Sequence, residues 1–131
     1  MGIEFENAPE KVQNFLKARK AVKANSTKDF SIKEIIGMAG TLAEAAVAFY
    51  YSDEIRKKYT AEEVGEISAS LVNGTKALME NDKQGLSELD ELDENYLKSV
   101  WDDVEDAFSK YYTEKLASDL RGEDNEDEET E

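Results

Sequence analysis

Apolar residues recur at three- and four-residue steps along most of the chain, the spacing that places them on one face of an α-helix. The pattern predicts four main helices, over about residues 9–24, 31–51, 60–79 and 88–120. A break in the last of them, near residue 94, would raise the number to five. The sequence therefore predicts an all-α fold, a compact bundle of four or five helices.

The starts of two helices are marked by capping boxes. Ser31 and Thr60 are each followed three residues later by a glutamate, Glu34 and Glu63. In this motif the hydroxyl accepts from the glutamate's amide, and the carboxylate accepts from the amide of the cap. Within the third helix, Asn73-Gly74 is expected to kink the helix or end it early, because glycine costs about 1 kcal/mol relative to alanine there.

The second helix is rich in glycine and alanine, so other helices can approach it closely and it is expected to lie at the centre. Its predicted buried residues are Ile32, Ile35, Ile36, Ala39, Leu42, Ala43, Ala46, Val47 and Tyr50. The predicted core of the whole bundle is Phe15, Ile35, Leu42, Val47, Ile67, Leu71, Val100, Trp101, Val104 and Phe108.

Charge changes the picture at the C-terminal end. The 131 residues carry a net charge of −15, and it is unevenly spread. Residues 1–28 hold six basic and three acidic residues, whereas residues 80–106 hold eleven acidic and two basic ones. Residues 122–131 hold seven acids and no base, with nothing to bury. We expect one helical domain over residues 1–121 and a disordered acidic tail over 122–131.

Several classes of chemistry lose support from the composition. The chain has no cysteine and no histidine, which removes the commonest general base and the usual ligands of transition metals. Paired carboxylates such as Asp102 and Asp106 arise by chance among 31 acids. We therefore expect a protein that is not an enzyme, with no catalytic, cofactor-binding or metal-binding residues and no cofactor.

One segment partly resembles a calcium loop. In residues 80–91, Gly85 and Glu91 fall at positions 6 and 12 of an EF-hand loop, but Glu80 stands where aspartate is needed. A plain acidic connection between helices is the favoured interpretation, and calcium binding is left open. The sequence has no run of about 18 apolar residues, so no membrane span is predicted. The acidic N-terminus lacks the apolar core of a signal peptide, so a cytoplasmic location is expected.

The fourth helix carries a wide aromatic and acidic face over residues 96–112. Such a face exceeds what one neighbouring helix needs, so part of it could bind a partner or form a dimer seam. Packing of the whole face against the second and third helices is the equal alternative. The candidate partner-binding residues are Tyr96, Val100, Trp101, Asp102, Asp103, Glu105, Asp106, Phe108 and Tyr112. The expected partner is a protein with basic or apolar surface, and homo-oligomerisation remains open.

The order of elements resembles one known family. A Lys/Ala-rich first helix precedes an apolar helix ending in Ala48-Phe49-Tyr50-Tyr51, and Tyr59-Thr60-Ala61-Glu62-Glu63-Val64 leads into a third helix. This organisation, over about residues 10–80, is similar to small tail assembly chaperones of long-tailed phages. The resemblance implies a helical, non-enzymatic adaptor that binds tape-measure or tail-tube subunits during assembly.

The acidity supports a competing hypothesis, an inhibitor that imitates nucleic acid, as some anti-restriction and anti-CRISPR proteins do. Direct binding of nucleic acid is not expected, because phosphates would be repelled. A mimic would bind a nucleic-acid enzyme with affinity that falls steeply in salt. An assembly chaperone would bind through apolar surface, and salt would matter little.

Overall fold

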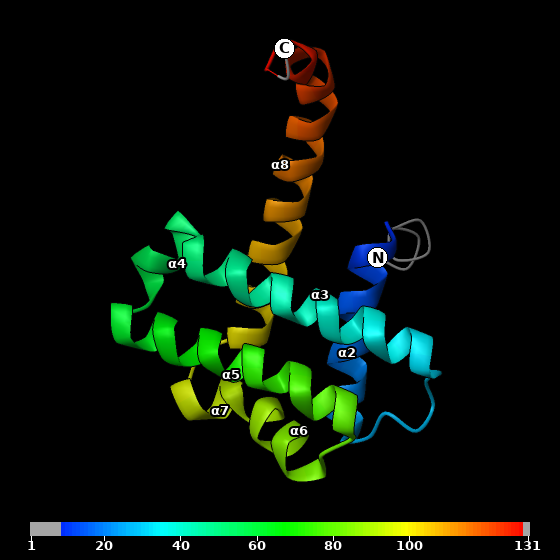
Figure 1. Cartoon of the computed structure of the whole chain (residues 1–131). Helices are drawn as coiled ribbons and strands as arrows, with labels where there is room; N and C mark the ends of the chain where they lie inside the picture. The colour runs from blue at the N-terminus through cyan, green and yellow to red at the C-terminus, as the bar shows by residue number, and fades with distance from the viewer. Residues whose placement is uncertain (1–8, 130–131) are drawn as a thin grey trace.

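The structure is a computed structural model that describes residues 9–129. Its elements are α2 (Glu10–Ala24), α3 (Ile32–Tyr51), α4 (Asp53–Lys58), α5 (Ala61–Glu80), α6 (Lys83–Asp90), α7 (Leu92–Tyr96) and α8 (Val100–Glu129) (Figure 1). The all-α prediction is confirmed over this range, which contains no strand. The predicted number of helices is wrong, since these residues form seven. None of the helices described is long and apolar enough to cross a membrane.

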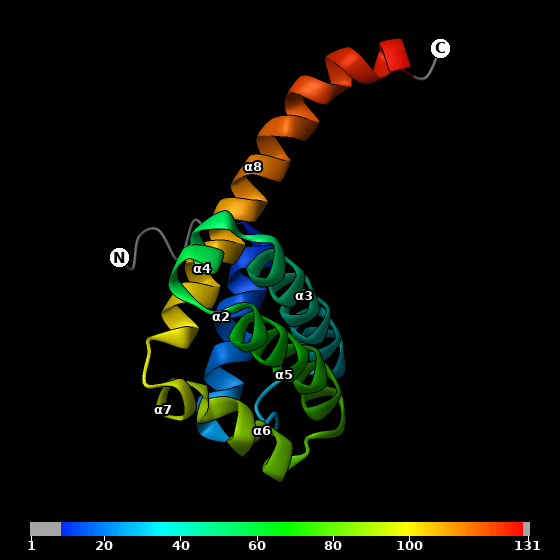
Figure 2. The same ribbon diagram turned by 90° about the vertical axis from the view of Figure 1, so that its left-hand side faces the viewer.

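The helices form two layers. The long helices α3 and α5 run antiparallel as a hairpin in front, and α2 and α8 lie behind them (Figures 1 and 2). The short helices α6 and α7 close one end. The hairpin is pinned by a side-chain bond, because the hydroxyl of Thr75 donates to the carbonyl of Ala39 at 3.3 Å. Since α2 and α8 cover only one side of the hairpin, its other side faces solvent.

Both predicted capping boxes form. Ser31 Oγ accepts from the Glu34 amide at 3.1 Å, and the Glu34 carboxylate accepts from the Ser31 amide at 2.8 Å. Thr60 and Glu63 repeat the arrangement at 3.0 and 2.9 Å. The backbone bonds from Ser31 and Thr60 are the main reason that the pKa values of Glu34 and Glu63 are lowered. These caps fix the starts of α3 and α5, the two helices of the front layer.

The predicted long fourth helix is instead three helices, and Leu97 marks the main break. Leu97 adopts the left-handed conformation, with φ of 54°. The amides of Leu97 and Lys98 bond back to the carbonyls of Glu94 and Asp93, the pattern of a Schellman motif. Asp93 then caps the next helix, because its carboxylate accepts from the Trp101 amide at 2.9 Å. The chain therefore turns before α8 and sends it along α2.

Gly74 does not kink α5, contrary to expectation. Its lack of a side chain lets α6 approach, since an added Cβ would overlap the side chain of Leu89 and lie 3.1 Å from Leu42. The helix continues to Glu80 and ends at Asn81, which is left-handed like Asn25 after α2. Asparagine tolerates this conformation better than most residues. The glycine thus permits helix packing rather than a bend.

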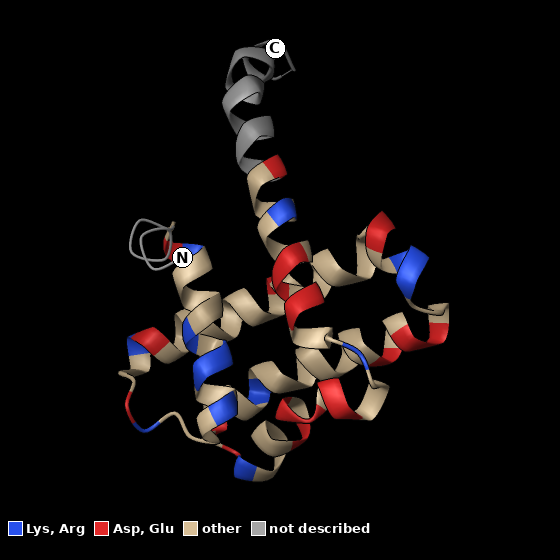
Figure 3. Cartoon of the chain, turned by 180° about the vertical axis from the view of Figure 1, so that it is seen from behind, with Lys and Arg blue, Asp and Glu red and all other residues tan. Residues whose placement is uncertain are grey.

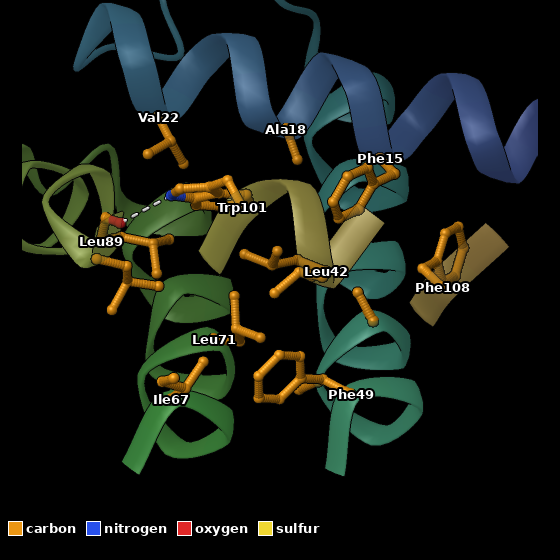
Figure 4. Close-up of a cluster of buried hydrophobic side chains, with 14 of the residues drawn as sticks. Phe15, Ala18, Val22, Leu42, Phe49, Ile67, Leu71, Leu89, Trp101 and Phe108 are labelled. Atoms are coloured by element: carbon orange, nitrogen blue, oxygen red, sulfur yellow. Dashed lines mark hydrogen bonds between the residues drawn. The ribbon is translucent and has the colours of Figure 1, made fainter. Parts of the chain in front are cut away.

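One hydrophobic cluster joins all seven helices, and Figure 4 shows its centre. Phe15 of α2 stacks on Phe108 of α8 with ring centroids 5.5 Å apart. The Trp101 indole lies between α2 and α6 and donates to the Leu89 carbonyl at 3.1 Å. The predicted core residues that are buried are Phe15, Leu42, Ile67, Leu71, Val100, Trp101, Val104 and Phe108.

Two predicted core residues are not buried. Val47 is 46% exposed, and Ile35 is half-buried. Three further α3 residues expected inside are exposed, namely Ile32, Ile36 and Tyr50. The reason is geometric: α3 is apolar around most of its circumference, and the core takes the side that carries Met38, Ala45 and Phe49. The apolar residues on the outward side of α3 therefore remain exposed.

The predicted acidic tail overlaps the end of α8. Residues 122–129 are the last turns of this helix, and residues 130–131 lie outside the described range. In both views the distal half of α8 stands clear of the other helices (Figures 1 and 2). Glutamate has good helix propensity, so a helix begun by the packed part of α8 can continue into this segment.

Candidate protein-binding surface

An apolar stripe runs along the outward side of α3. After Lys33, every fully exposed residue of this helix is aliphatic, aromatic or glycine. They are Ile36, Gly40, Val47, Tyr50 and Tyr51, with half-buried Ala43 between them and Ile32 before them. The three- and four-residue spacing puts Ile36, Gly40, Ala43, Val47 and Tyr50 on one line of the helix surface. In a chain with 36% charged residues, such a line is unusual.

A second stripe runs beside it on α5. Its members have the same spacing and are Gly65, Ala69, Val72, Lys76 and Met79. Val72 and Met79 are 52% and 54% exposed. We call the two stripes together the α3/α5 face: Ile36, Gly40, Ala43, Val47 and Tyr50 of α3 with Gly65, Ala69, Val72, Lys76 and Met79 of α5. This face is turned toward the viewer in Figure 1.

A shallow hollow of about 210 Å³ lies between the stripes. Its lining is almost wholly apolar and comprises Ala46, Val47, Tyr50, Tyr51, Ser68, Ala69 and Val72. The hollow arises because α3 and α5 meet there through small residues, Ala46 against Ser68 and Ala69. Val47, Tyr50 and Val72 stand around it. A protruding aliphatic side chain of another molecule would fit such a depression.

Ser68 is the one polar residue of the hollow. It is only 8% exposed, and its Oγ is the one buried side-chain polar atom without a hydrogen-bond partner among the described residues. Leaving a buried hydroxyl unpaired costs about 1–3 kcal/mol. The hollow therefore has one unsatisfied polar atom beneath it, closed off from solvent.

Charge is almost absent from the α3/α5 face. Glu44, the one acid of α3 after Glu34, points toward α2 and pairs with Lys11 at 2.8 Å. Lys76 is the one charged member of the face, and it has no ion-pair partner among the described residues. The charged side chains gather on the opposite side, where Figure 3 shows basic residues on α2 and acidic ones on α6, α7 and the start of α8.

The sequence placed the candidate surface elsewhere, on residues 96–112. The structure buries the apolar part of that stretch, since Val100, Trp101 and Phe108 all lie in the core. Tyr112 is half-buried with its ring 6.3 Å from that of Phe108. These four side chains pack within the molecule, while Tyr111 of the same stretch is 40% exposed. The packing alternative named the second and third helices, but Phe108 stacks on Phe15 of the first helix and Trp101 lies against α2 and α6.

Two acids of the stretch pair with α2. Arg19 donates to Asp102 at 3.0 Å and to Glu105 at 2.7 Å. Its guanidinium also lies 5.9 Å from the centre of the Trp101 ring. These contacts clamp the start of α8 to α2, so Asp102 and Glu105 already have a basic partner inside the molecule.

Asp103 is buried in a polar network between α4 and α8. It accepts from the Tyr59 hydroxyl at 2.6 Å and from Lys58 at 2.8 Å. Burial, followed by the hydrogen bond and charge of Asp103, raises the pKa of Tyr59 well above its usual range. Tyr96 is half-buried and donates to Glu66 at 3.0 Å; burial and Glu66 raise its pKa as well. Both tyrosines stay protonated donors at neutral pH.

Of the nine predicted site residues, Asp106 alone is exposed without a hydrogen bond or ion pair among the described residues. It belongs to a wider group of exposed acids that lack an ion-pair partner there. The group is Glu88 and Asp90 of α6, Glu91, Glu94 of α7 and Asp106 of α8. Asp106 is thus the one predicted site residue in this acidic surface, which is accessible to a basic partner.

The calcium-loop interpretation of residues 80–91 does not hold. Residues 83–90 form α6, so the segment lacks the open loop whose oxygens surround calcium. Asp82 instead caps this helix, since its carboxylate accepts from the Gly85 amide at 3.2 Å. Within the part of the chain that the structure describes, no three acids lie together in a way that could hold a metal ion.

The α3/α5 face was not predicted from the sequence, because Ile36, Val47 and Tyr50 of α3 were assigned to the core. One signal was available. From Ile35 to Tyr51 the sequence holds a single charged residue, Glu44, and a helix that is apolar on every side needs cover on every side. In a chain this short, the other helices cannot supply it.

Known proteins give no further guidance to the surface. Comparison of the chain with models of protein families, with curated proteins and with solved structures finds no match.

Proposed function

We propose that this protein is a non-enzymatic adaptor, of the assembly-chaperone kind, that binds another protein through the α3/α5 face. The observation that carries the proposal is the α3 stripe, an uncharged line on a helix whose two acids after Lys33, Glu34 and Glu44, pair with Lys17 and Lys11. Exposed apolar patches of this kind mark interaction sites in proteins whose remaining surface is polar. A sequence without histidine or cysteine supports a binding role over a catalytic one.

The chemistry of the face defines the partner. An apolar surface with a hollow is complementary to aliphatic or aromatic side chains presented by a helix or a sheet. The resemblance to phage tail assembly chaperones adds a candidate class, structural subunits that need their apolar surfaces covered before assembly. A cytoplasmic location is part of this proposal. Nucleic acid is not a partner on this proposal, because the face offers one cation, Lys76.

A second candidate function is favoured by a different surface. The unpaired acids of α6, α7 and α8 could bind a basic protein, as a mimic of nucleic acid does. Glu91, Glu94 and Asp106 are exposed on that side of the molecule. Binding through them would depend on charge and would weaken steeply as salt rises.

One experiment separates the two functions. The protein is immobilised, exposed to a lysate of the cells that produce it, and eluted with a salt gradient. Wild type is compared with Val47→Glu on the α3/α5 face and with Glu91→Gln/Glu94→Gln on the acidic surface. We expect the retained proteins, further copies of this chain included, to survive high salt and to be lost with Val47→Glu, because a carboxylate on the face must be desolvated.

The control is Leu97→Glu, which adds the same charge at an exposed apolar residue outside the face. It should retain what wild type retains. Release at moderate salt, together with loss in the Glu91→Gln/Glu94→Gln variant, would favour the mimic instead. Retention of the same proteins by every variant would refute a role for either surface.

A further inference from the structure

We propose that the α3/α5 face binds a second copy of this chain, with the two copies related by a two-fold axis that crosses both helices at Ala43 and Val72. The inference rests on the proposed function, since it takes this face to be protein-binding, and it names the protein that binds. In such a dimer, α3 packs antiparallel on α3 of the other copy, and α5 packs antiparallel on α5.

Each stripe is arranged symmetrically about its middle residue. On α3, Gly40 and Ile36 lie three and seven residues before Ala43, and Val47 and Tyr50 lie four and seven after it. On α5 the same steps about Val72 give Ala69 and Gly65 on one side, Lys76 and Met79 on the other. A two-fold interface uses the same patch on both copies, so a patch must complement itself when reversed. Both stripes meet this condition.

The two centres also lie at the same level of the hairpin. Leu42 lies across from Gly74, and Ala39 is bonded to Thr75. The hollow brings Ala46 and Val47 beside Ser68 and Ala69. In an antiparallel pair these neighbours set Ala43 beside Val72. A single two-fold axis can therefore relate both stripes to their copies in the second molecule. This would not be possible if the centres of the two stripes lay at different levels of the hairpin.

The reversed copy brings complementary features together. Ile36 of the second copy reaches the level of Tyr50, at the edge of the apolar hollow. Lys76 of the second copy reaches the level of Ala69, a small residue along which its aliphatic stem can lie while the ammonium group stays in solvent. Gly40, Ala43, Gly65 and Ala69 keep the helices close.

Area and charge both allow the dimer. Each helix has 20 residues, so the face is about 30 Å long and about 20 Å wide, a footprint of about 600 Å². Specific interfaces begin at about 600 Å² on each partner. The acids of α6 to α8 lie on the opposite layer (Figure 3), so two copies of charge −15 approach through their least charged sides.

Cysteine cross-linking tests the axis, and the chain has no native cysteine to interfere. In the full chain, Ala43→Cys and Val72→Cys each place two thiols beside the two-fold axis. We expect mild oxidation to convert both variants to covalent dimers. Leu97→Cys, exposed but off the face, should stay a monomer on a denaturing gel. Cross-linking of Leu97→Cys as fast as Ala43→Cys, or none of either, would overturn the proposed arrangement.

Sedimentation equilibrium of unmodified variants gives an independent test. Wild type should approach twice 14.7 kDa as concentration rises. Val47→Glu and Val72→Glu should raise the dissociation constant at least about tenfold, while Leu97→Glu leaves it unchanged. Circular dichroism checks that each variant remains folded.

The outcomes separate this inference from the proposed function. A wild-type mass of 14.7 kDa at all concentrations overturns self-association. The adaptor role then still stands if Val47→Glu loses a lysate protein that Leu97→Glu retains.

Discussion

The α3/α5 face and the 96–112 stretch have similar sequence patterns, but in the structure the first is exposed and the apolar part of the second is buried. Both are helical and carry apolar residues at three- and four-residue steps. The 96–112 stretch has neighbours on its apolar side, and its acids at Asp102 and Glu105 meet Arg19 of α2. The α3/α5 face has neighbours only behind it. Whether an apolar stripe belongs to the core thus depends on how many helices remain to cover it, which the stripe itself does not reveal.

The two regions should differ most in the loss of stability when one large side chain is truncated in each. Trp101→Ala should destabilise folding by about 3–5 kcal/mol, because it opens a cavity and strands the Leu89 carbonyl. Val47→Ala should change stability by less than about 0.5 kcal/mol at protein concentrations low enough to keep the chain monomeric. Urea unfolding followed by circular dichroism measures both. Equal losses would mean that the two regions are equally buried.

Asp103 provides the next largest effect. In Asp103→Ala the Tyr59 hydroxyl, itself in a residue only 5% exposed, loses its acceptor. We expect a loss of about 1–3 kcal/mol in the free energy of unfolding. Asp106→Ala, three residues away in the exposed acidic surface, is the matched control and should be nearly neutral. Comparable losses would show that Asp103 has no special structural role.

The same network predicts a loss of stability at alkaline pH. The pKa of Tyr59 is raised in the folded protein above the value of 10.0 expected when unfolded. Its stabilising contribution is therefore complete below pH 10 and declines as pH rises beyond that, because the unfolded state releases the proton first. Tyr59→Phe should show a shallower decline in unfolding free energy between pH 9 and 11. A parallel decline in both proteins would assign it to other groups.

The left-handed backbone of Leu97, in the turn before α8, predicts a smaller effect. A left-handed backbone costs a residue with a side chain about 1–2 kcal/mol, and Leu97, at 89% exposure, recovers little through burial. Leu97→Gly should therefore stabilise the fold, by about 0.5 kcal/mol after the added flexibility of the unfolded chain is subtracted. A rise in urea midpoint with unchanged slope would be the signature, and a fall would indicate that the Leu97 side chain is packed.

The smallest effect is expected from the end of α8. Removal of residues 122–131 should leave the melting temperature unchanged, because the last turns of α8, up to residue 129, stand clear of the other helices (Figures 1 and 2). Differential scanning calorimetry at low protein concentration measures this. A large drop in melting temperature would give the tail a structural role.

The particular residues show what the sequence could predict and what it could not. The helix starts at Ser31 and Thr60 could be predicted because a capping box is local, with every partner within three residues. The αL turn at Leu97 was missed because its sequence carries no glycine or asparagine at that position. The break needs Asp93 to cap Trp101 across the turn, a contact that only the folded chain makes.

The candidate site illustrates the same limit. Val47 and Phe49 are two residues apart on α3 and equally apolar, yet one is half exposed and the other fully buried. The helical period identified the stripe to which each belongs. Choosing between the stripes required the positions of α2 and α8, which depend on long-range packing. The unpaired hydroxyl of Ser68 likewise emerges only when α3 and α5 are placed together.

The most direct test of the α3/α5 face as the contact surface is amide hydrogen exchange at two protein concentrations a hundredfold apart. We predict slower exchange at the higher concentration in peptides covering residues 35–51 and 65–79, and unchanged exchange in residues 96–112. Slowing confined to residues 96–112 would contradict the account and return the contact surface to α8.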